Sequence, residues 1–587
     1  MKSLLRLRPY LAKYKNTLLW GICTVIVSNL FMVATPLFIG NAIDTIKRGL
    51  ETGTLHHTDL LVYAGLIVGF ALISGYMTFL TRQTIIVVSR KIEYDLRNDF
   101  LAHIQKLPLN YFQNTPTGDL MAHATNDISA VRNVLGPGIM YPSDTFMTFS
   151  MALTLMFIKD PSLTWMALVP LPLVSYAVYK LGQIIHAKFN ERQKQYSLLT
   201  TRAQENLSGI RVVKAYVREE HEIGLFEKLS WEYLKKNLVL AKAQSVMWPL
   251  MYMLVGFSLI ITVYFGGLQV IEGKITIGTL TAFFTYLSML IWPMIAFGWV
   301  TNIIQQGAAS MERLGKIFDT VPEIRDTEAT DILIKHLEGE IEFSNVSFTH
   351  KGAATPTLQD ISLRIPKGTT LAVVGYTGSG KSTFINLISR LYDVTEGDLR
   401  IDGVDIKKIP LEVLRTHIGY VPQETFLFSE SISENISYGV DGTSREQIHE
   451  AAEISQIGKD VSEFPQQFDT MLGERGITLS GGQKQRTSIA RAVLRKPKIL
   501  ILDDALSSVD TYTEEAILAR LRRVMEDRTS IIISHRISTV KDADMIIVLD
   551  KGRIVEKGSH SELVERGGIY ANLHFKQLLE KELEQLN

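Results

Sequence analysis

Residues 375–383 read Gly375, Tyr376, Thr377, Gly378, Ser379, Gly380, Lys381, Ser382 and Thr383. This stretch fits the pattern G-x-x-x-x-G-K-[ST], and it lies between a strand-like run over 370–374 and a helix-like run over 383–391. In such a loop, backbone N–H groups and a helix N-terminus hold phosphate oxygens. Lys381 neutralises the β- and γ-phosphates, and the Ser382 hydroxyl ligates Mg²⁺. The stretch therefore predicts a site for ATP and Mg²⁺ in an α/β domain.

Two further motifs follow this loop along the chain. Residues 499–503 are an apolar run that ends in a carboxylate, which predicts a buried parallel strand that delivers Asp503 to the Mg²⁺ shell. Residues 479–483 read Leu-Ser-Gly-Gly-Gln, and a serine and two glycines that open a helix form a second anion-binding end. One phosphate loop already serves one nucleotide, so the second end suggests contact with ATP held by a partner chain. The contributing residues are Ser480, Gly481, Gly482 and Gln483.

The first half of the chain is dominated by apolar stretches. Six of them occur, at 16–40, 60–81, 137–158, 163–183, 246–271 and 277–304. Each has the roughly 20 residues that a helix needs to cross a bilayer. We therefore predict an α-helical transmembrane domain of six spans fused to an α/β P-loop cassette. The expected boundaries are 1–320 for the transmembrane domain, 321–338 for a linker and 339–587 for the cassette.

Basic residues predict the orientation of these spans. Five basic residues and no acidic ones precede the first stretch, and the long segments 82–136 and 184–245 are also rich in Lys and Arg. The positive-inside rule then places the N-terminus, both long segments and the cassette in the cytoplasm. Helical periodicity in the long segments predicts extensions of the spans, with turns at Thr117-Gly118-Asp119 and near 208–211.

Composition excludes some classes of function. The 61 basic and 61 acidic residues of the 587-residue chain cancel, so no global charge indicates a nucleic-acid partner. A single cysteine, Cys23, excludes an internal disulfide framework and any metal site built from several cysteines.

The order of the motifs resembles that of the ATP-binding cassette (ABC) family. It runs from the phosphate loop through Gln423, LSGGQ and Asp503 to Asp510 and His535, and six spans ahead of one cassette look like an exporter-type half-transporter. The resemblance is closest to bacterial multidrug subunits of the MdlA/BmrC kind. It places the chain in a bacterial inner or plasma membrane, as a multi-pass protein in contact with lipids.

The resemblance also implies roles for individual residues. Gln423 would sense Mg²⁺ and couple to the membrane helices. Ser480, Gly482 and Gln483 would touch the γ-phosphate of ATP on the opposite subunit. Asp510 would lie at the dimer seam, His535 would contact the γ-phosphate, and residues 473–476 resemble a loop specific to exporters.

Two positions depart from the family pattern. The residue after Asp503 is Asp504, where active members carry the glutamate that polarises the attacking water, and aspartate is one methylene shorter. His350 occupies the place of an aromatic residue that stacks on adenine. We therefore expect weak hydrolysis at the site built on this chain, with Asp504, His535 and Gln423 as its catalytic groups. We also expect a heterodimer with a second half-transporter that keeps the glutamate.

The transported substrate is less defined by the sequence. Methionine and aromatic residues in the spans suit amphipathic small molecules, but they also suit ordinary packing and lipid contact. Asp144 lies furthest inside a span, where it either faces cationic drugs or caps and pairs near the cytoplasmic end. Export of drugs, export of a lipid or peptide, and a regulatory subunit that binds ATP without transport remain open.

Overall fold

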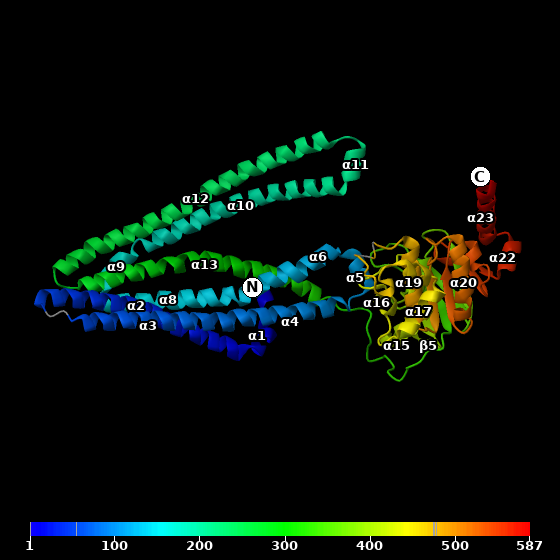
Figure 1. Cartoon of the computed structure of the whole chain (residues 1–587), viewed down its shortest axis with the longest axis horizontal. Helices are drawn as coiled ribbons and strands as arrows, with labels where there is room; N and C mark the ends of the chain where they lie inside the picture. The colour runs from blue at the N-terminus through cyan, green and yellow to red at the C-terminus, as the bar shows by residue number, and fades with distance from the viewer. Residues whose placement is uncertain (1, 54–55, 474–475, 477, 587) are drawn as a thin grey trace. The chain divides into compact units, whose positions relative to one another are not determined.

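The computed structural model describes every residue except 1, 54–55, 474–475, 477 and 587. The chain forms two compact units (Figure 1). The first contains Met1–Ile104 and Thr117–Thr320, and the second contains Gln105–Pro116 and Val321–Asn587. The second unit is thus built from two separate parts of the sequence.

All regular secondary structure among the described residues of the first unit is helical. Its helices are η1 (Lys2–Leu7), α1 (Arg8–Lys13), α2 (Lys15–Thr52), α3 (His57–Thr81), η2 (Arg82–Ile86), α4 (Val87–Ile104), α6 (Thr117–Ala122), η3 (His123–Asp127), α7 (Ile128–Leu135), α8 (Pro137–Lys159), α9 (Pro161–Leu168), α10 (Leu171–Ser208), α11 (Ile210–Ala215), α12 (Glu219–Ile271) and α13 (Ile277–Phe318). Among the described residues, four helical segments are long and apolar enough to cross a membrane: Lys15–Thr52, His57–Ile104, Glu219–Ile271 and Ile277–Phe318.

The other two apolar stretches also form helices. The stretch 137–158 coincides with α8, whereas the stretch 163–183 is divided between α9 and α10. The break falls at Val169 and Pro170, and α10 carries a further proline, Pro172, in its first turn. Proline has no backbone N–H to donate, so helical hydrogen bonding is interrupted at this point.

The two long segments that are predicted to lie between spans, 82–136 and 184–245, form helical hairpins. Helices α10 and α12 run side by side with α11 at their tip (Figure 1), as expected for the turn near 208–211. The first turn differs from the expectation at Thr117-Gly118-Asp119, because these residues begin α6. The chain reverses instead within 105–116, which contains α5 (Leu109–Asn114). Pro116 disfavours helical backbone at the preceding residue, and Thr115 is extended accordingly.

Two sheets form the centre of the second unit. The four-stranded sheet has the order β2 (Leu358–Ile365), β1 (Ile341–Phe348), β4 (Glu396–Ile401), β5 (Val404–Asp405). The six-stranded sheet has the order β10 (Arg553–Gly558), β9 (Met545–Asp550), β3 (Thr370–Gly375), β8 (Thr529–Ile533), β7 (Ile499–Asp503), β6 (Ile418–Val421). The first sheet is antiparallel, and the second is parallel from β9 to β6. Strands β7 and β8 are buried along their whole length, which explains why they read as continuous apolar runs.

Helices surround both sheets of the second unit. Besides α5 they are α14 (Lys381–Ile388), η4 (Ile406–Lys408), α15 (Leu411–Thr416), α16 (Ile432–Ser437), α17 (Arg445–Ile454), α18 (Gly458–Glu463), η5 (Gln467–Asp469), α19 (Gly481–Leu494), α20 (Thr511–Met525), α21 (Ile537–Val540), α22 (His560–Arg566) and α23 (Ile569–Leu586). Strand β8 lies between β3 and β7, so the carboxyl ends of these three parallel strands meet at one edge. This edge collects the phosphate loop, Asp503 and His535.

Candidate nucleotide-binding site

The phosphate loop connects β3 to α14 through glycines that no other residue could replace. Gly375 has a φ of 152°, and an added Cβ would lie 2.2 Å from the carbonyl oxygen of Leu549. Gly380 caps α14 with a φ of 101°, and an added Cβ would lie 2.9 Å from Leu358 Cδ2. Side chains are excluded at both points, which leaves the backbone N–H groups of the loop accessible to an anion.

Polar groups inside the loop match a phosphate ligand. The Lys381 side chain is 7% exposed, and its Nζ donates to the carbonyl oxygens of Gly375 at 2.9 Å and Tyr376 at 2.8 Å. The Ser379 hydroxyl is buried, and no hydrogen-bond partner for it exists among the described residues. Burial of a hydroxyl without a hydrogen-bond partner lowers the stability of the fold, and a bound phosphate oxygen would supply that partner. The loop therefore fits the triphosphate of ATP.

His350, the residue predicted to stack on adenine, lies beside the start of α14. Its Nε2 is 3.5 Å from the Thr383 hydroxyl oxygen, and its ring meets the rings of Phe348 and Tyr392 edge to face, with centroids 4.8 Å and 5.3 Å away. Tyr392 in turn donates its hydroxyl hydrogen to the Gln113 side-chain oxygen of α5 at 3.1 Å. An aromatic cluster thus connects the predicted adenine position with α5.

Asp503 lies at the buried end of β7, next to Ser382. Burial raises the pKa of the Asp503 carboxyl, and the charge of Asp504 raises it further, whereas the hydrogen bond from Ser382 and the charge of Lys381 lower it. A carboxylate held near a hydroxyl in this way offers two oxygen ligands of the kind that Mg²⁺ prefers. Gln423, the third predicted ligand, is exposed just after β6 and has no hydrogen bond to either residue in the described part of the chain.

Asp504 has a fixed backbone in an unusual conformation. Its φ is 47°, in the left-handed region, which aspartate tolerates better than most residues. Its N–H donates to the carbonyl oxygen of Ile533 at 2.9 Å, and its own carbonyl oxygen accepts from Gln485 Nε2 at 3.4 Å. His535, two residues beyond β8, is exposed, and its charge acts on the neighbouring Asp503. The structure thus brings Asp504, Asp503 and His535 to the same edge of the sheet.

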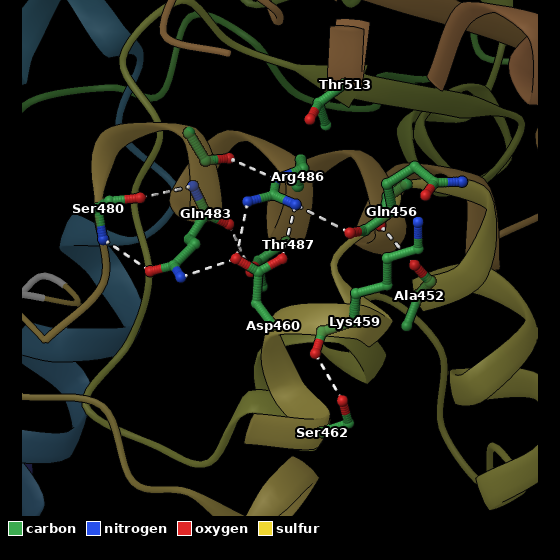
Figure 2. A network of polar contacts seen from close by, with 12 residues as sticks. Ala452, Gln456, Lys459, Asp460, Ser462, Ser480, Gln483, Arg486, Thr487 and Thr513 are labelled. Atoms are coloured by element: carbon green, nitrogen blue, oxygen red, sulfur yellow. Dashed lines mark hydrogen bonds and ion pairs between the residues drawn. The ribbon is translucent and has the colours of Figure 1, made fainter. Parts of the chain in front are cut away.

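The LSGGQ segment opens α19 with a capping box. Ser480 Oγ accepts from the Gln483 N–H at 3.3 Å, and the Gln483 side-chain oxygen accepts from the Ser480 N–H at 2.9 Å. Gln483 Nε2 also donates to Asp460 at 2.9 Å (Figure 2). The Gln483 side chain is therefore occupied by contacts within this chain, and the N–H groups of Gly481 and Gly482 are the donors that this helix end offers to an anion.

Asp460 of α18 was not indicated by any motif, yet it anchors the LSGGQ segment. Arg486 binds its carboxylate through both terminal nitrogens, at 2.7 Å and 3.0 Å, and also donates to the Gln456 carbonyl oxygen at 2.9 Å (Figure 2). Two-pronged pairs of this kind are geometrically specific. Asp460 is one of two acids in the short helix α18, about 20 residues before LSGGQ in sequence, and no local pattern distinguishes it.

Gln485 is a second residue that sequence reasoning missed. It is buried in α19, and its side chain bonds the Ser507 hydroxyl and the Ser508 N–H, both at 2.9 Å. It therefore connects the LSGGQ helix with the segment that follows Asp504.

Asp510, another of the predicted site residues, lies at the surface. Asp510 caps α20 by accepting from the Thr513 N–H at 2.9 Å, and this backbone hydrogen bond lowers the pKa of Asp510. Within the segment 473–476 that resembles an exporter loop, Glu474 and Arg475 lie outside the described residues.

Comparison with known proteins identifies the family. The profile described as "ABC transporter transmembrane region" matches residues 18–294, and the profile described as "ABC transporter" matches residues 358–507. The chain belongs to the ABC transporter family. It is a multi-pass membrane protein of the exporter type whose cassette binds ATP and couples ATP hydrolysis to transport.

Several ABC transporters are similar over nearly the whole chain. "Probable multidrug resistance ABC transporter ATP-binding/permease protein YheI" of Bacillus subtilis is 37% identical over 95% of each chain. "Multidrug resistance-like ATP-binding protein MdlA" of Escherichia coli is 32% identical over 100% of this chain and 98% of that protein. "ATP-dependent lipid A-core flippase" of Syntrophus aciditrophicus is 38% identical over 87% of this chain and 84% of that protein.

A solved structure supports the same assignment. The structure described as that of "a bacterial Atm1-family ABC exporter with ATP bound" matches with a TM-score of 0.81 and 27% identity, over 96% of this chain and 99% of that chain. These findings confirm the predicted helical transmembrane domain fused to a nucleotide-binding cassette.

Proposed function

We propose that this chain is one half of a heterodimeric exporter, and that the ATP site built on its own phosphate loop hydrolyses slowly. The observation that carries this proposal is Asp504, whose backbone is held by hydrogen bonds at both its N–H and its carbonyl group. The shorter side chain cannot regain its reach by a shift of the backbone. The capped LSGGQ segment is intact. It would contact a second ATP, bound to a partner that carries glutamate at the position equivalent to Asp504.

We assign the roles of the site residues as follows. Residues 375–383 bind the phosphates, His350 stacks on the adenine, and Ser382, Asp503 and Gln423 hold Mg²⁺. Mg²⁺, when bound, offsets negative charge on the β- and γ-phosphates. Asp504 polarises water weakly, His535 contacts the γ-phosphate, Asp510 lies at the seam between subunits, and the LSGGQ helix end contacts the partner's ATP.

The exposed apolar surface at the tip of the α10–α12 hairpin is a second argument for a partner chain. Helix α11 and the residues around it expose large apolar side chains, among them Val212, Tyr216 and Val217, which are 61%, 75% and 82% exposed. Such a cluster is unfavourable in water and is typical of a surface that another protein covers. We assign it to the cassette of the second subunit. The cassette and the N-terminus lie in the cytoplasm in this arrangement.

We propose drugs or other amphipathic small molecules as substrates, drawn from the cytoplasm or the inner leaflet. The names of the YheI and MdlA relatives refer to multidrug resistance. Relatives named as lipid A-core flippases are equally similar, so export of a lipid is the second candidate. A regulatory subunit that binds ATP without moving a substrate is the third.

ATP turnover by the purified chain alone tests the asymmetric site. The full-length chain in lipid nanodiscs should bind ATP but turn it over slowly, and addition of a partner with the glutamate should restore turnover. Brisk turnover without a partner would contradict the proposal. Dye efflux and stimulation of turnover by drugs or by lipid A in vesicles then separate the three candidate functions.

A further inference from the structure

A buried polar cluster joins α2 and α8 inside the transmembrane unit. Asn29 is 1% exposed, and its side-chain nitrogen donates to the Val25 carbonyl oxygen at 3.0 Å and to Asp144 Oδ1 at 2.8 Å. The Thr148 hydroxyl donates to the side-chain oxygen of Asn29. Both amide hydrogens and the oxygen of Asn29 are thus occupied, which fixes its orientation and holds the Asp144 carboxylate in place.

Within the described part of the chain, no hydrogen bond reaches the second carboxylate oxygen of Asp144. Among the described residues, no Lys, Arg or His forms an ion pair with Asp144, and Asn29 supplies its one hydrogen bond. Asp44, another acid in α2, differs because its two oxygens accept from the Gly278 N–H at 2.8 Å and the Thr276 hydroxyl at 2.6 Å. Asp44 therefore holds the start of α13, whereas Asp144 is a half-buried acid to which the described residues supply no balancing charge. Burial of an unbalanced carboxylate in an apolar setting costs free energy.

Asp144 shares one face of α8 with groups that suit an organic cation. Residues 141, 144, 145 and 148 follow helical spacing and lie on the same side. The Tyr141 ring meets the Trp299 ring of α13 edge to face at 5.0 Å, and Trp299 is 46% exposed. The Thr145 hydroxyl on this face is buried, and it has no hydrogen-bond partner within the described residues. A carboxylate beside aromatic faces is the combination that attracts ammonium and phosphonium groups.

We propose that Asp144 binds the positive charge of a monovalent organic cation, with Tyr141 and Trp299 contacting its apolar groups. Asn29 and Thr148 act as positioning residues that hold the carboxylate. This inference rests on the proposed exporter function and narrows its substrates to a class that includes organic cations. Of the two roles that the sequence left open for Asp144, contact with a cationic drug and pairing near the end of a span, the proposal favours the first.

Binding of tetraphenylphosphonium to the full-length chain in nanodiscs tests the inference. Triphenylphosphine oxide, which is neutral, serves as the comparison ligand. Asp144→Asn should weaken tetraphenylphosphonium binding about ten- to hundredfold, as expected for loss of one charged contact, and should leave binding of the neutral ligand unchanged. Asp144→Glu should retain most of the affinity, and Asp44→Asn, the matched control, should bind both ligands as the unaltered chain does.

Protection from a hydrophobic carbodiimide tests the same site without any substitution. Dicyclohexylcarbodiimide labels intramembrane carboxyl groups, and saturating tetraphenylphosphonium should protect Asp144 where triphenylphosphine oxide does not. Absence of protection, or equal effects of Asp144→Asn and Asp44→Asn, would overturn the inference. So would normal cation binding by Asp144→Asn together with altered pH dependence of transport, since that result indicates a proton site.

The outcomes also separate this inference from the exporter function. If the chain exports a neutral dye but does not bind tetraphenylphosphonium, the cation site is refuted and the exporter function is unaffected. A chain that binds the cation through Asp144 but exports nothing would support the site and contradict the exporter function.

Discussion

Lengthening one side chain should activate the ATP site of this chain. In Asp504→Glu, the carboxylate gains one methylene, about 1.5 Å of reach. Two hydrogen bonds oppose a compensating shift of the backbone in the unaltered chain, because the Asp504 nitrogen is 2.9 Å from the Ile533 carbonyl oxygen and the Asp504 carbonyl oxygen is 3.4 Å from Gln485 Nε2. A misplacement of about 1 Å costs roughly a hundredfold in rate, or about 2.7 kcal/mol of barrier.

We therefore expect kcat of Asp504→Glu to rise about a hundredfold, with KM for ATP nearly unchanged, because the phosphate loop and not residue 504 binds the nucleotide. Glutamate in the left-handed conformation should lower stability by about 1 kcal/mol. Phosphate release by the full-length chain in nanodiscs measures the effect, and Asp527→Glu, which lengthens an exposed acid elsewhere, is the matched control. An Asp504→Glu turnover within twofold of the unaltered chain would refute the reasoning.

Three other substitutions test the site. Lys381→Ala removes the amine between two loop carbonyls and should weaken binding of a fluorescent ATP analogue about ten- to hundredfold; unchanged affinity would contradict the assigned role. His350→Tyr supplies a larger ring and should tighten ATP binding about two- to tenfold, as measured by titration, so weaker binding would argue against adenine stacking. Asp460→Ala leaves Gln483 and Arg486 without their shared acceptor and should destabilise the chain by about 1–3 kcal/mol. It should also slow ATP turnover at the partner's site without changing ATP affinity at its own phosphate loop, and an equal loss at both sites would indicate a general folding defect.

The sequence was most informative where function depends on a local motif. The phosphate loop could be predicted because its glycines meet backbone requirements that are visible in a few residues, as at Gly375 and Gly380. The spans could be predicted because the bilayer demands length and apolarity. The first turn was expected at Thr117-Gly118-Asp119, but these residues begin α6, and the chain reverses earlier, within 105–116.

Contacts between residues that are distant in the sequence could not be predicted. Folding brings Asp460 into contact with the LSGGQ segment and Gln485 into contact with the residues after Asp504. No local sequence pattern indicates either contact. The environment of Asp144 was equally hidden, because Asn29 lies 115 positions away in the sequence. The chemistry of a single motif can thus be predicted from a few neighbouring residues. The residues that hold the motif in place become evident only in the tertiary structure.

A continuous fragment that contains the cassette alone would lack one part of its compact unit. Helix α5 comes from residues 105–116 but belongs to the same compact body as Val321–Asn587, where its Gln113 accepts from Tyr392. A soluble fragment that begins near 321 would expose the seat of α5 and leave that phenol hydroxyl to water, one contact away from the histidine at the predicted adenine position. Nucleotide affinities measured on such a fragment would therefore lack any contribution that α5 makes through Tyr392 to the surroundings of His350.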